Sequence, residues 1–153
     1  MALVDSNWSS QFSISGALVY FMGALVHWFS KTQKSVSLST AEAEFFGAML
    51  AAKDLMWIRD LLSDLGYQQK GPTRIRLDSK SAIDMAFDPV AFKKTKHIMR
   101  AAEYLRDLVA RLKVTLDHIE GSRNVSDILT KAQARPVFLS LIKMLLDAEP
   151  VLR

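Results

Sequence analysis

The sequence predicts an α/β protein in which a five-stranded mixed sheet is flanked by helices. Two observations carry this prediction. Five short stretches have the composition or the alternating polarity of strands, and four other stretches have apolar residues at helical spacing. Three strands come first, and strands and helices alternate afterwards. That order is typical of a sheet that begins with antiparallel neighbours and continues through right-handed crossovers.

The five expected strands are short and are bounded by polar or turn residues. Residues 2–4 form a buried stretch that ends in Asp5, so close to Met1 that we expect the natural chain to continue upstream. Residues 14–22 and 24–30 are rich in large apolar side chains, and Gly23 between them indicates a hairpin. Two later stretches alternate between apolar and polar side chains, as strands with one buried face do: residues 73–78 and 113–120.

The longest helix is expected over residues 40–65, with Ser39 or Thr40 as its cap. Its apolar residues recur at spacings of three and four, so one stripe of the helix must be buried against the sheet: Phe45, Ala48, Ala52, Leu55, Ile58 and Leu62. Shorter helices are expected over residues 79–87 and 95–112. A last helical pattern runs from Val125 to about Ala148 and is interrupted at Pro136.

Length and composition describe one globular domain, residues 1–153. Half of the residues are hydrophobic and 24% are charged, so the chain can bury a core without disulfides or structural zinc. The absence of cysteine excludes thiol chemistry and cysteine-bound metals. The longest apolar run, residues 16–29, is too short to cross a membrane, and we recognise no secretory signal. We therefore expect an intracellular protein without a membrane partner, and its net charge of +4 favours a polyanionic one.

Four acidic residues occupy positions from which ligands are bound in α/β proteins. Asp5 and Asp78 close the first and fourth strands, Glu44 opens the long helix, and Asp127 lies in the first turn after the fifth strand. The carboxyl ends of parallel strands and the helix starts that follow them share one edge of the sheet. Clustered carboxylates there require a cation, and oxygen ligands favour Mg²⁺ or Mn²⁺ over zinc. Taken singly, each acid is also explained as a cap or turn residue.

Several blocks of the sequence are similar to those of a known family. It resembles the ribonuclease H domain of Ty1/copia-type retrotransposon polyproteins over nearly its whole length. The resemblance is carried by blocks in the order found in that family: Asp5 to Trp8, Ser13 to Gly16, Trp28 to Gln33, Leu38 to Phe45, Asp78 to Ile83, Thr95 to Ile98, and Ser126 to Lys131.

The resemblance implies an RNase H-like fold and a hydrolase that cuts the RNA strand of RNA/DNA hybrids. It assigns the acidic metal site to Asp5, Glu44, Asp78 and Asp127, the same four residues that their positions had indicated. It also implies two Mg²⁺ ions, for which Mn²⁺ can substitute, activating a water and stabilising the leaving 3′ oxygen. The expected partners are the hybrid and an upstream reverse transcriptase domain. The expected location is a cytoplasmic particle or the nucleus.

Two other functions are compatible with such a chain. The first is a domesticated module that binds nucleic acid or a reverse transcriptase without cutting, which loss of any of the four acids would have favoured. The second is an integrase or resolvase-type nuclease, which would need a different acidic pattern.

A basic group marks the region where we expect the hybrid to bind. Residues 91–113 contain seven cations and two acids, a net charge of +5, so the rest of the chain is close to neutral. We expect the nucleic acid to contact Lys93, Lys94, Lys96, His97 and Arg100. A solvated helix face is the alternative for the cations, and a packing or surface role is the alternative for His97. For His118, in the fifth expected strand, a packing or surface role is favoured.

Overall fold

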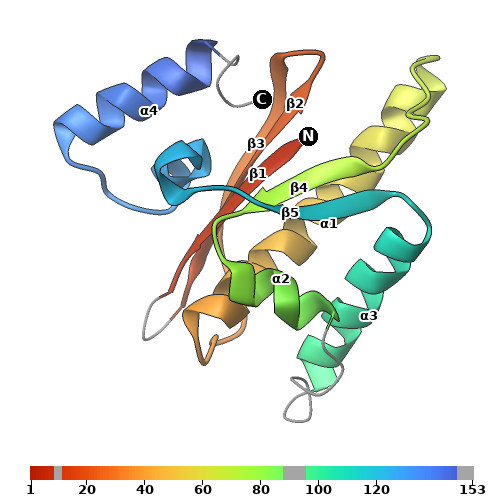
Figure 1. The fold of residues 1–153 in the computed structure, drawn as a ribbon, viewed down its shortest axis with the longest axis horizontal. Helices are drawn as coiled ribbons and strands as arrows, with labels where there is room; N and C mark the ends of the chain where they lie inside the picture. The colour runs from red at the N-terminus through yellow and green to blue at the C-terminus, as the bar shows by residue number, and fades with distance from the viewer. Residues whose placement is uncertain (9–11, 88–95, 148–153) are drawn as a thin grey trace.

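The computed structural model describes residues 1–8, 12–87 and 96–147, with residues 96–98 described by their backbone alone (Figure 1). It contains the expected five-stranded mixed sheet, in the order β3-β2-β1-β4-β5. The fold class predicted from the sequence is therefore confirmed. The strands are β1 (Ala2–Asn7), β2 (Ile14–Phe21), β3 (Ala24–Thr32), β4 (Thr73–Leu77) and β5 (Val114–His118).

The pairing of the strands makes β1 the centre of the sheet. It runs antiparallel to β2, which pairs antiparallel with β3, and it runs parallel to β4, which pairs parallel with β5. The hairpin expected around Gly23 is present, with a tight turn at Met22 and Gly23. Because β1, β4 and β5 are parallel, their carboxyl ends lie at the same edge, where side chains from separate parts of the chain can meet.

Three helices cover one face of the sheet (Figure 1). Helix α1 (Thr40–Asp64) packs across β1, β2 and β4, with α2 (Lys80–Phe87) and α3 (Lys96–Ala110) beside it. The main hydrophobic core lies beneath these helices and includes Phe45, Leu55 and Leu105. Ser39 caps α1 by accepting a hydrogen bond from the backbone N–H of Glu42, which satisfies one of the unpaired donors at the helix start.

The opposite face is covered by the C-terminal part of the chain. Two 3₁₀ helices, η2 (Gly121–Arg123) and η3 (Val125–Leu129), lead to α4 (Arg135–Asp147), which is seen in blue on the other side of the sheet in Figure 1. A second, smaller core forms there around Leu3, Leu18 and Leu141. Within the described parts of the chain, no helix is both long and apolar enough to span a membrane.

The structure corrects two details of the expected elements. Asp5 does not close β1, because Ser6 and Asn7 continue the ladder by pairing with Ser15 and Ile14. The last helical pattern is also not one interrupted helix from Val125. The carbonyl of Leu129 accepts from the Ser30 hydroxyl at 2.7 Å, so the end of η3 is tied to the sheet, and α4 begins afterwards. Pro136 lies in the first turn of α4, where a missing N–H costs no hydrogen bond.

Candidate metal centre

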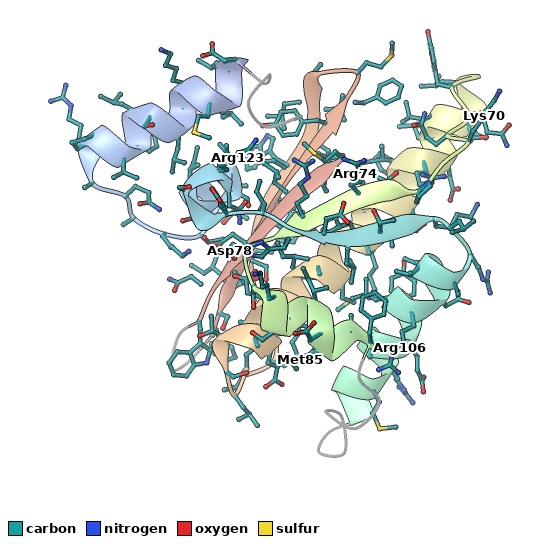
Figure 2. The ribbon with its side chains drawn as sticks, in the orientation of Figure 1. Lys70, Arg74, Asp78, Met85, Arg106 and Arg123 are labelled. Atoms are coloured by element: carbon teal, nitrogen blue, oxygen red, sulfur yellow. The ribbon has the colours of Figure 1, made fainter. Side chains whose placement is uncertain are left out.

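Three carboxylates from distant parts of the chain meet beside the carboxyl end of β4. Asp5 projects from β1 and is fully buried, Asp78 directly follows β4, and Asp127 belongs to η3. Figure 2 shows Asp78 where β4 ends, between the sheet and α2. One oxygen of each carboxylate lies within 4.8 Å of the others, close enough for all three to reach a common cation.

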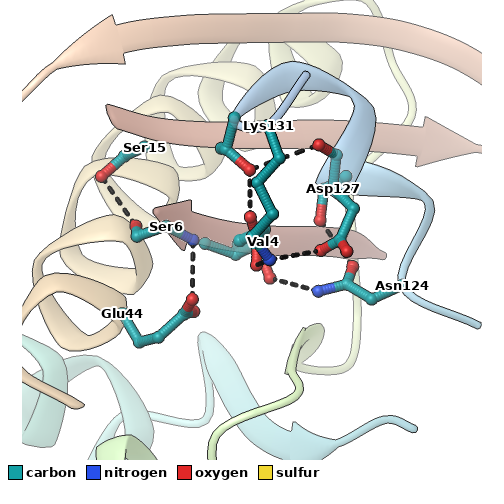
Figure 3. A network of polar contacts seen from close by, with 10 residues as sticks. Val4, Ser6, Ser15, Glu44, Asn124, Asp127 and Lys131 are labelled. Carbon is teal, nitrogen blue, oxygen red and sulfur yellow. Dashed lines mark hydrogen bonds and ion pairs between the residues drawn. The ribbon is translucent and has the colours of Figure 1, made fainter. Parts of the chain in front are cut away.

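The ammonium group of Lys131 bridges two of these carboxylates (Figure 3). Its Nζ lies 3.2 Å from Oδ1 of Asp5 and 3.1 Å from Oδ1 of Asp127. The hydroxyl of Thr130 donates to Oδ2 of Asp5, so both oxygens of this buried carboxylate have a partner. Thr130 and Lys131 belong to the last block of the family resemblance, which assigns no role to either residue.

Contacts around η3 hold Asp127 and Lys131 against the sheet. The side-chain amide of Asn124 donates to the carbonyl of Val4 at 2.9 Å, which ties the loop before η3 to β1. At the other end, Gly16 of β2 allows a close approach. A Cβ at Gly16 would lie only 2.6 Å from Cβ of Leu129 and 3.0 Å from Cγ2 of Thr130. Because Gly16 has no side chain, Thr130 can lie close enough to donate its hydrogen bond to Asp5.

Glu44 approaches the same centre from α1. Its Oε1 accepts the backbone N–H of Ser6 at 2.7 Å, and its Oε2 is buried without a donor among the described residues (Figure 3). The helix can come this close because Gly47 has no side chain. A Cβ there would lie 2.4 Å from Oγ of Ser6. Glu44 does not belong to the set of oxygens within 4.8 Å, but it lines one cavity of about 390 Å³ together with Asp78 and Lys131.

The electrostatics of the centre show an excess of negative charge. The pKa of Glu44 is raised from 4.5 to about 9, with burial as the largest cause and the nearby Asp5 as the second. Burial and Asp5 also raise the pKa of Asp127 to about 6 and the pKa of Asp78 above its usual value. Burial alone would lower the pKa of Lys131, but Asp5 and Asp127 together raise it. One ammonium group therefore faces a cluster of acids that stabilises positive charge.

A divalent cation fits this arrangement. The donors are carboxylate oxygens, which suit Mg²⁺ or Mn²⁺. The buried Oε2 of Glu44, which finds no donor, and the ammonium group between Asp5 and Asp127 both mark places where positive charge is stabilising. Asp5, Asp78 and Asp127 could hold the ion directly, and Glu44 lies on the rim of the same cavity.

His97 and His118, two of the three histidines, lie differently with respect to this centre. Nε2 of His118, at the exposed end of β5, lies 3.2 Å from the backbone oxygen of Asp78. His118 is exposed, and this contact places it beside the acidic centre. His97 belongs to the first turn of α3, and its side chain lies outside the described residues.

The expected basic group is described only in part. Lys93 and Lys94 lie outside the described residues, and Lys96 begins α3. Arg100 is exposed and lines a groove of about 680 Å³ between α1, α3 and the segment after β3. Other cations line the same groove over a partly apolar floor of Phe46, Met49, Leu50 and Tyr104: Lys31, Lys34 and Lys53. Lys31 is partly neutralised, since its Nζ lies 3.5 Å from Oδ2 of Asp54.

Comparison with solved structures defines the class of the fold. A crystal structure of LC11-RNase H1 in complex with an RNA/DNA hybrid superposes with a TM-score of 0.62 at 15% identity, covering 84% of this chain and 91% of that one. RNase H1 from Halobacterium salinarum superposes with a TM-score of 0.56 at 16% identity, covering 95% of this chain and 96% of that one. The chain therefore has the ribonuclease H fold.

Sequence comparison identifies the relatives. The chain is 36% identical over 126 residues to the "Retrovirus-related Pol polyprotein from transposon TNT 1-94" of Nicotiana tabacum, a match that covers 82% of this chain and 9% of that protein. It is 30% identical over 141 residues to the Pol polyprotein from transposon RE2 of Arabidopsis thaliana, covering 90% of this chain and 10% of that protein. No family model matches the chain.

These matches confirm the resemblance expected from the sequence. The chain is homologous to a segment of plant Pol polyproteins of the copia type, and the chain itself has the ribonuclease H fold. The chain spans about a tenth of the length of these relatives.

Proposed function

We propose that the protein is a metal-dependent endoribonuclease that cleaves the RNA strand of RNA/DNA hybrids. The observation that carries the proposal is the cluster of Asp5, Asp78 and Asp127, whose carboxylate oxygens lie within 4.8 Å on a ribonuclease H fold. The relatives support the biological setting, because they are retrovirus-related Pol polyproteins. The hybrid bound to LC11-RNase H1 supports the choice of substrate.

The proposed metal ligands are Asp5, Glu44, Asp78 and Asp127, with two Mg²⁺ ions that Mn²⁺ can replace. When bound, these ions supply an activated water and stabilise the leaving 3′ oxygen in phosphodiester hydrolysis. The protein contributes a rigid frame for the ligands. Asp5 is fixed by the strand pairing of β1, and Glu44 is oriented by the N–H of Ser6. Binding to 2′-hydroxyl groups would distinguish the RNA strand from DNA.

The polyprotein relatives also support the proposed partners. The proposed partner is an upstream reverse transcriptase domain in the same polyprotein, since the relatives are retrovirus-related Pol polyproteins. The proposed location is intracellular, in a cytoplasmic particle or the nucleus. The basic group of Lys93, Lys94, Lys96, His97 and Arg100 is proposed to contact the hybrid backbone.

The direct test is an assay with a labelled RNA/DNA hybrid in the presence of Mg²⁺. We expect cleavage of the RNA strand, with no cleavage of RNA/RNA or DNA/DNA duplexes. Asp5→Asn should be inactive, whereas Asp84→Asn, an exposed acid on α2, serves as the matched control and should be as active as the unmodified protein. Hybrid binding without cleavage would instead support the non-catalytic module, and equal cleavage by the Asp5 variant would refute the metal-site assignment.

A further inference from the structure

Lys131 occupies the place in the acidic centre where positive charge is most strongly required. Its ammonium group lies 3.2 Å from Oδ1 of Asp5 and 3.1 Å from Oδ1 of Asp127, so it contacts two of the three clustered carboxylates at once. Asp5 is fully buried, and its other oxygen accepts a hydrogen bond from Thr130. No oxygen of Asp5 is therefore left without a partner.

Binding of a metal ion by the oxygens that Lys131 contacts would bring the ion close to the ammonium group. A carboxylate oxygen that coordinates Mg²⁺ does so at 2.0–2.1 Å, and an ammonium group that remained on the same oxygens would lie next to a divalent cation. At such separations, repulsion between like charges in a partly buried site amounts to several kcal/mol. The hydroxyl of Thr130 carries no charge and can stay in place.

We propose that Lys131 is the internal counter-ion of the metal-free site and that metal binding displaces its ammonium group from Asp5 and Asp127. This inference rests on the proposed metal site and deepens it. The side chain of Lys131 is 37% exposed and lines the open cavity that also contains Glu44 and Asp78, so it has room to swing away while the three acids stay where they are.

The displacement has two opposite consequences. Without metal, Lys131 stabilises the fold by offsetting the repulsion between Asp5 and Asp127. With metal, the same contacts weaken the observed affinity, because they must be broken when the ion enters. A lysine that stayed in place would also repel the ion, and its removal would also tighten metal binding, so the position of the ammonium group with metal bound distinguishes the two cases.

The test is the metal affinity of Lys131→Met, measured by titration calorimetry with Mg²⁺ alone and without nucleic acid. Methionine keeps much of the side-chain length and removes the charge. We expect Mg²⁺ to bind roughly tenfold more tightly, corresponding to about 1.4 kcal/mol, and the metal-free variant to unfold at a lower temperature. Excess Mg²⁺ should restore most of the lost thermal stability. Lys143→Met, at an exposed position of α4, is the matched control and should change neither quantity.

A second measurement uses the unmodified protein and does not depend on whether a variant folds. An ammonium group held by two carboxylates exchanges its protons slowly, so its ¹⁵N-coupled NMR signal should be visible without metal. The signal should shift or disappear during a Mg²⁺ titration, with the same midpoint as the calorimetric curve. Its assignment comes from its absence in Lys131→Arg, which keeps the positive charge and should not show the tighter metal binding of the methionine variant.

The outcomes separate this inference from the proposed function. Tighter binding in Lys131→Met together with a metal-dependent change of the NMR signal would support displacement. Metal binding by the unmodified protein with equal or weaker affinity in Lys131→Met, or with an unchanged ammonium signal at saturation, would overturn displacement and leave the metal site standing. Absence of Mg²⁺ and Mn²⁺ binding in both the unmodified protein and Lys131→Met would contradict the metal site itself.

Discussion

The backbone N–H of Ser6 donates to Oε1 of Glu44 at 2.7 Å, while the other oxygen of this carboxylate is buried without a donor among the described residues. Strand β1 therefore orients Glu44 through Ser6, the residue that follows Asp5 on this strand. The contact fixes the direction of Glu44 without providing a positive charge. A buried acid in this environment favours its protonated form, and this has a measurable effect on stability.

The pH dependence of stability should report on Glu44. Its pKa is raised from 4.5 to about 9, so the metal-free folded state holds a proton that the unfolded chain releases. Stability from this group is fully present below the unfolded pKa and is lost as pH rises towards about 9, by at most about 1.4 kcal/mol per pH unit for one proton. In Glu44→Gln, the free energy of unfolding should decrease less as the pH rises.

This prediction is checked by urea unfolding of the metal-free protein at a series of pH values across that window. Glu103→Gln, an exposed position on α3, is the control and should keep the pH dependence of the unmodified protein. Identical curves for Glu44→Gln and the unmodified protein would show that Glu44 does not bind this proton.

Asp78→Asn should change activity and stability in opposite directions. Burial and Asp5 raise the pKa of Asp78, so its charge is destabilising in the metal-free protein, and the amide should unfold at a slightly higher temperature. Cleavage should fall by more than about 100-fold, since loss of a direct ligand should cost more than the 10- to 100-fold typical of outer-shell partners. The two measurements are thermal unfolding without metal and cleavage of hybrid with Mg²⁺. Higher stability with unchanged cleavage would remove Asp78 from the ligand set.

Asp127→Asn should be tolerated better than changes at the other three acids. Its side chain is 22% exposed, whereas Asp5 is fully buried. An exposed ligand can be replaced in part by water, which Mg²⁺ usually retains in its coordination shell. We therefore expect residual cleavage in Asp127→Asn that exceeds the residual cleavage in Asp5→Asn, measured on the same hybrid at saturating Mg²⁺. The reverse order would contradict the prediction.

Gly16→Ala should loosen the acidic centre from a distance. The added Cβ would lie 2.6 Å from Cβ of Leu129, which forces β2 and the end of η3 apart. We expect a loss of about 1–3 kcal/mol in the free energy of unfolding, typical of overpacking, together with weaker Mg²⁺ binding because Thr130 and Asp127 move away from Asp5. Gly71→Ala is the matched control, since a Cβ there would have no atom within 4 Å. Similar effects of the two substitutions would contradict the proposed role of close packing.

Combined replacement of Lys93, Lys94 and Lys96 by alanine should weaken hybrid binding several-fold at moderate salt. Each lysine that contacts a phosphate contributes close to one unit to the slope of log affinity against log salt, so the slope should become flatter by up to about three units. Turnover at saturating substrate should change little. Lys70→Ala serves as the control, because Figure 2 shows Lys70 at the far end of the molecule from Asp78. An unchanged slope in the triple variant would place the binding surface elsewhere, and the groove lined by Lys34, Lys53 and Arg100 would be examined next.

The sequence was sufficient to predict most elements of the fold and to single out Asp5, Asp78 and Asp127, which the structure brings together. Strand alternation and the helical stripe from Phe45 to Leu62 are local patterns, and they report which face of each element is buried. The positions of Glu44 and Asp78 next to the expected ends of elements were also readable, because caps and strand ends have local signals. The family resemblance pointed to the same acids.

Only the tertiary structure decided how these residues meet. Lys131 contacts Asp5 across 126 positions of the chain, and no periodicity of the sequence reports such a contact. The distances between the acidic side chains depend on how closely neighbouring segments pack. Gly16 allows β2 to approach η3, and Gly47 allows α1 to approach Ser6 of β1. The end of η3 likewise depends on a distant residue, because the hydroxyl of Ser30 donates to the carbonyl of Leu129. Helix α4 begins only after this contact. Local sequence patterns specify the faces of helices and strands, whereas the site depends on side-chain packing between segments that are far apart in the chain.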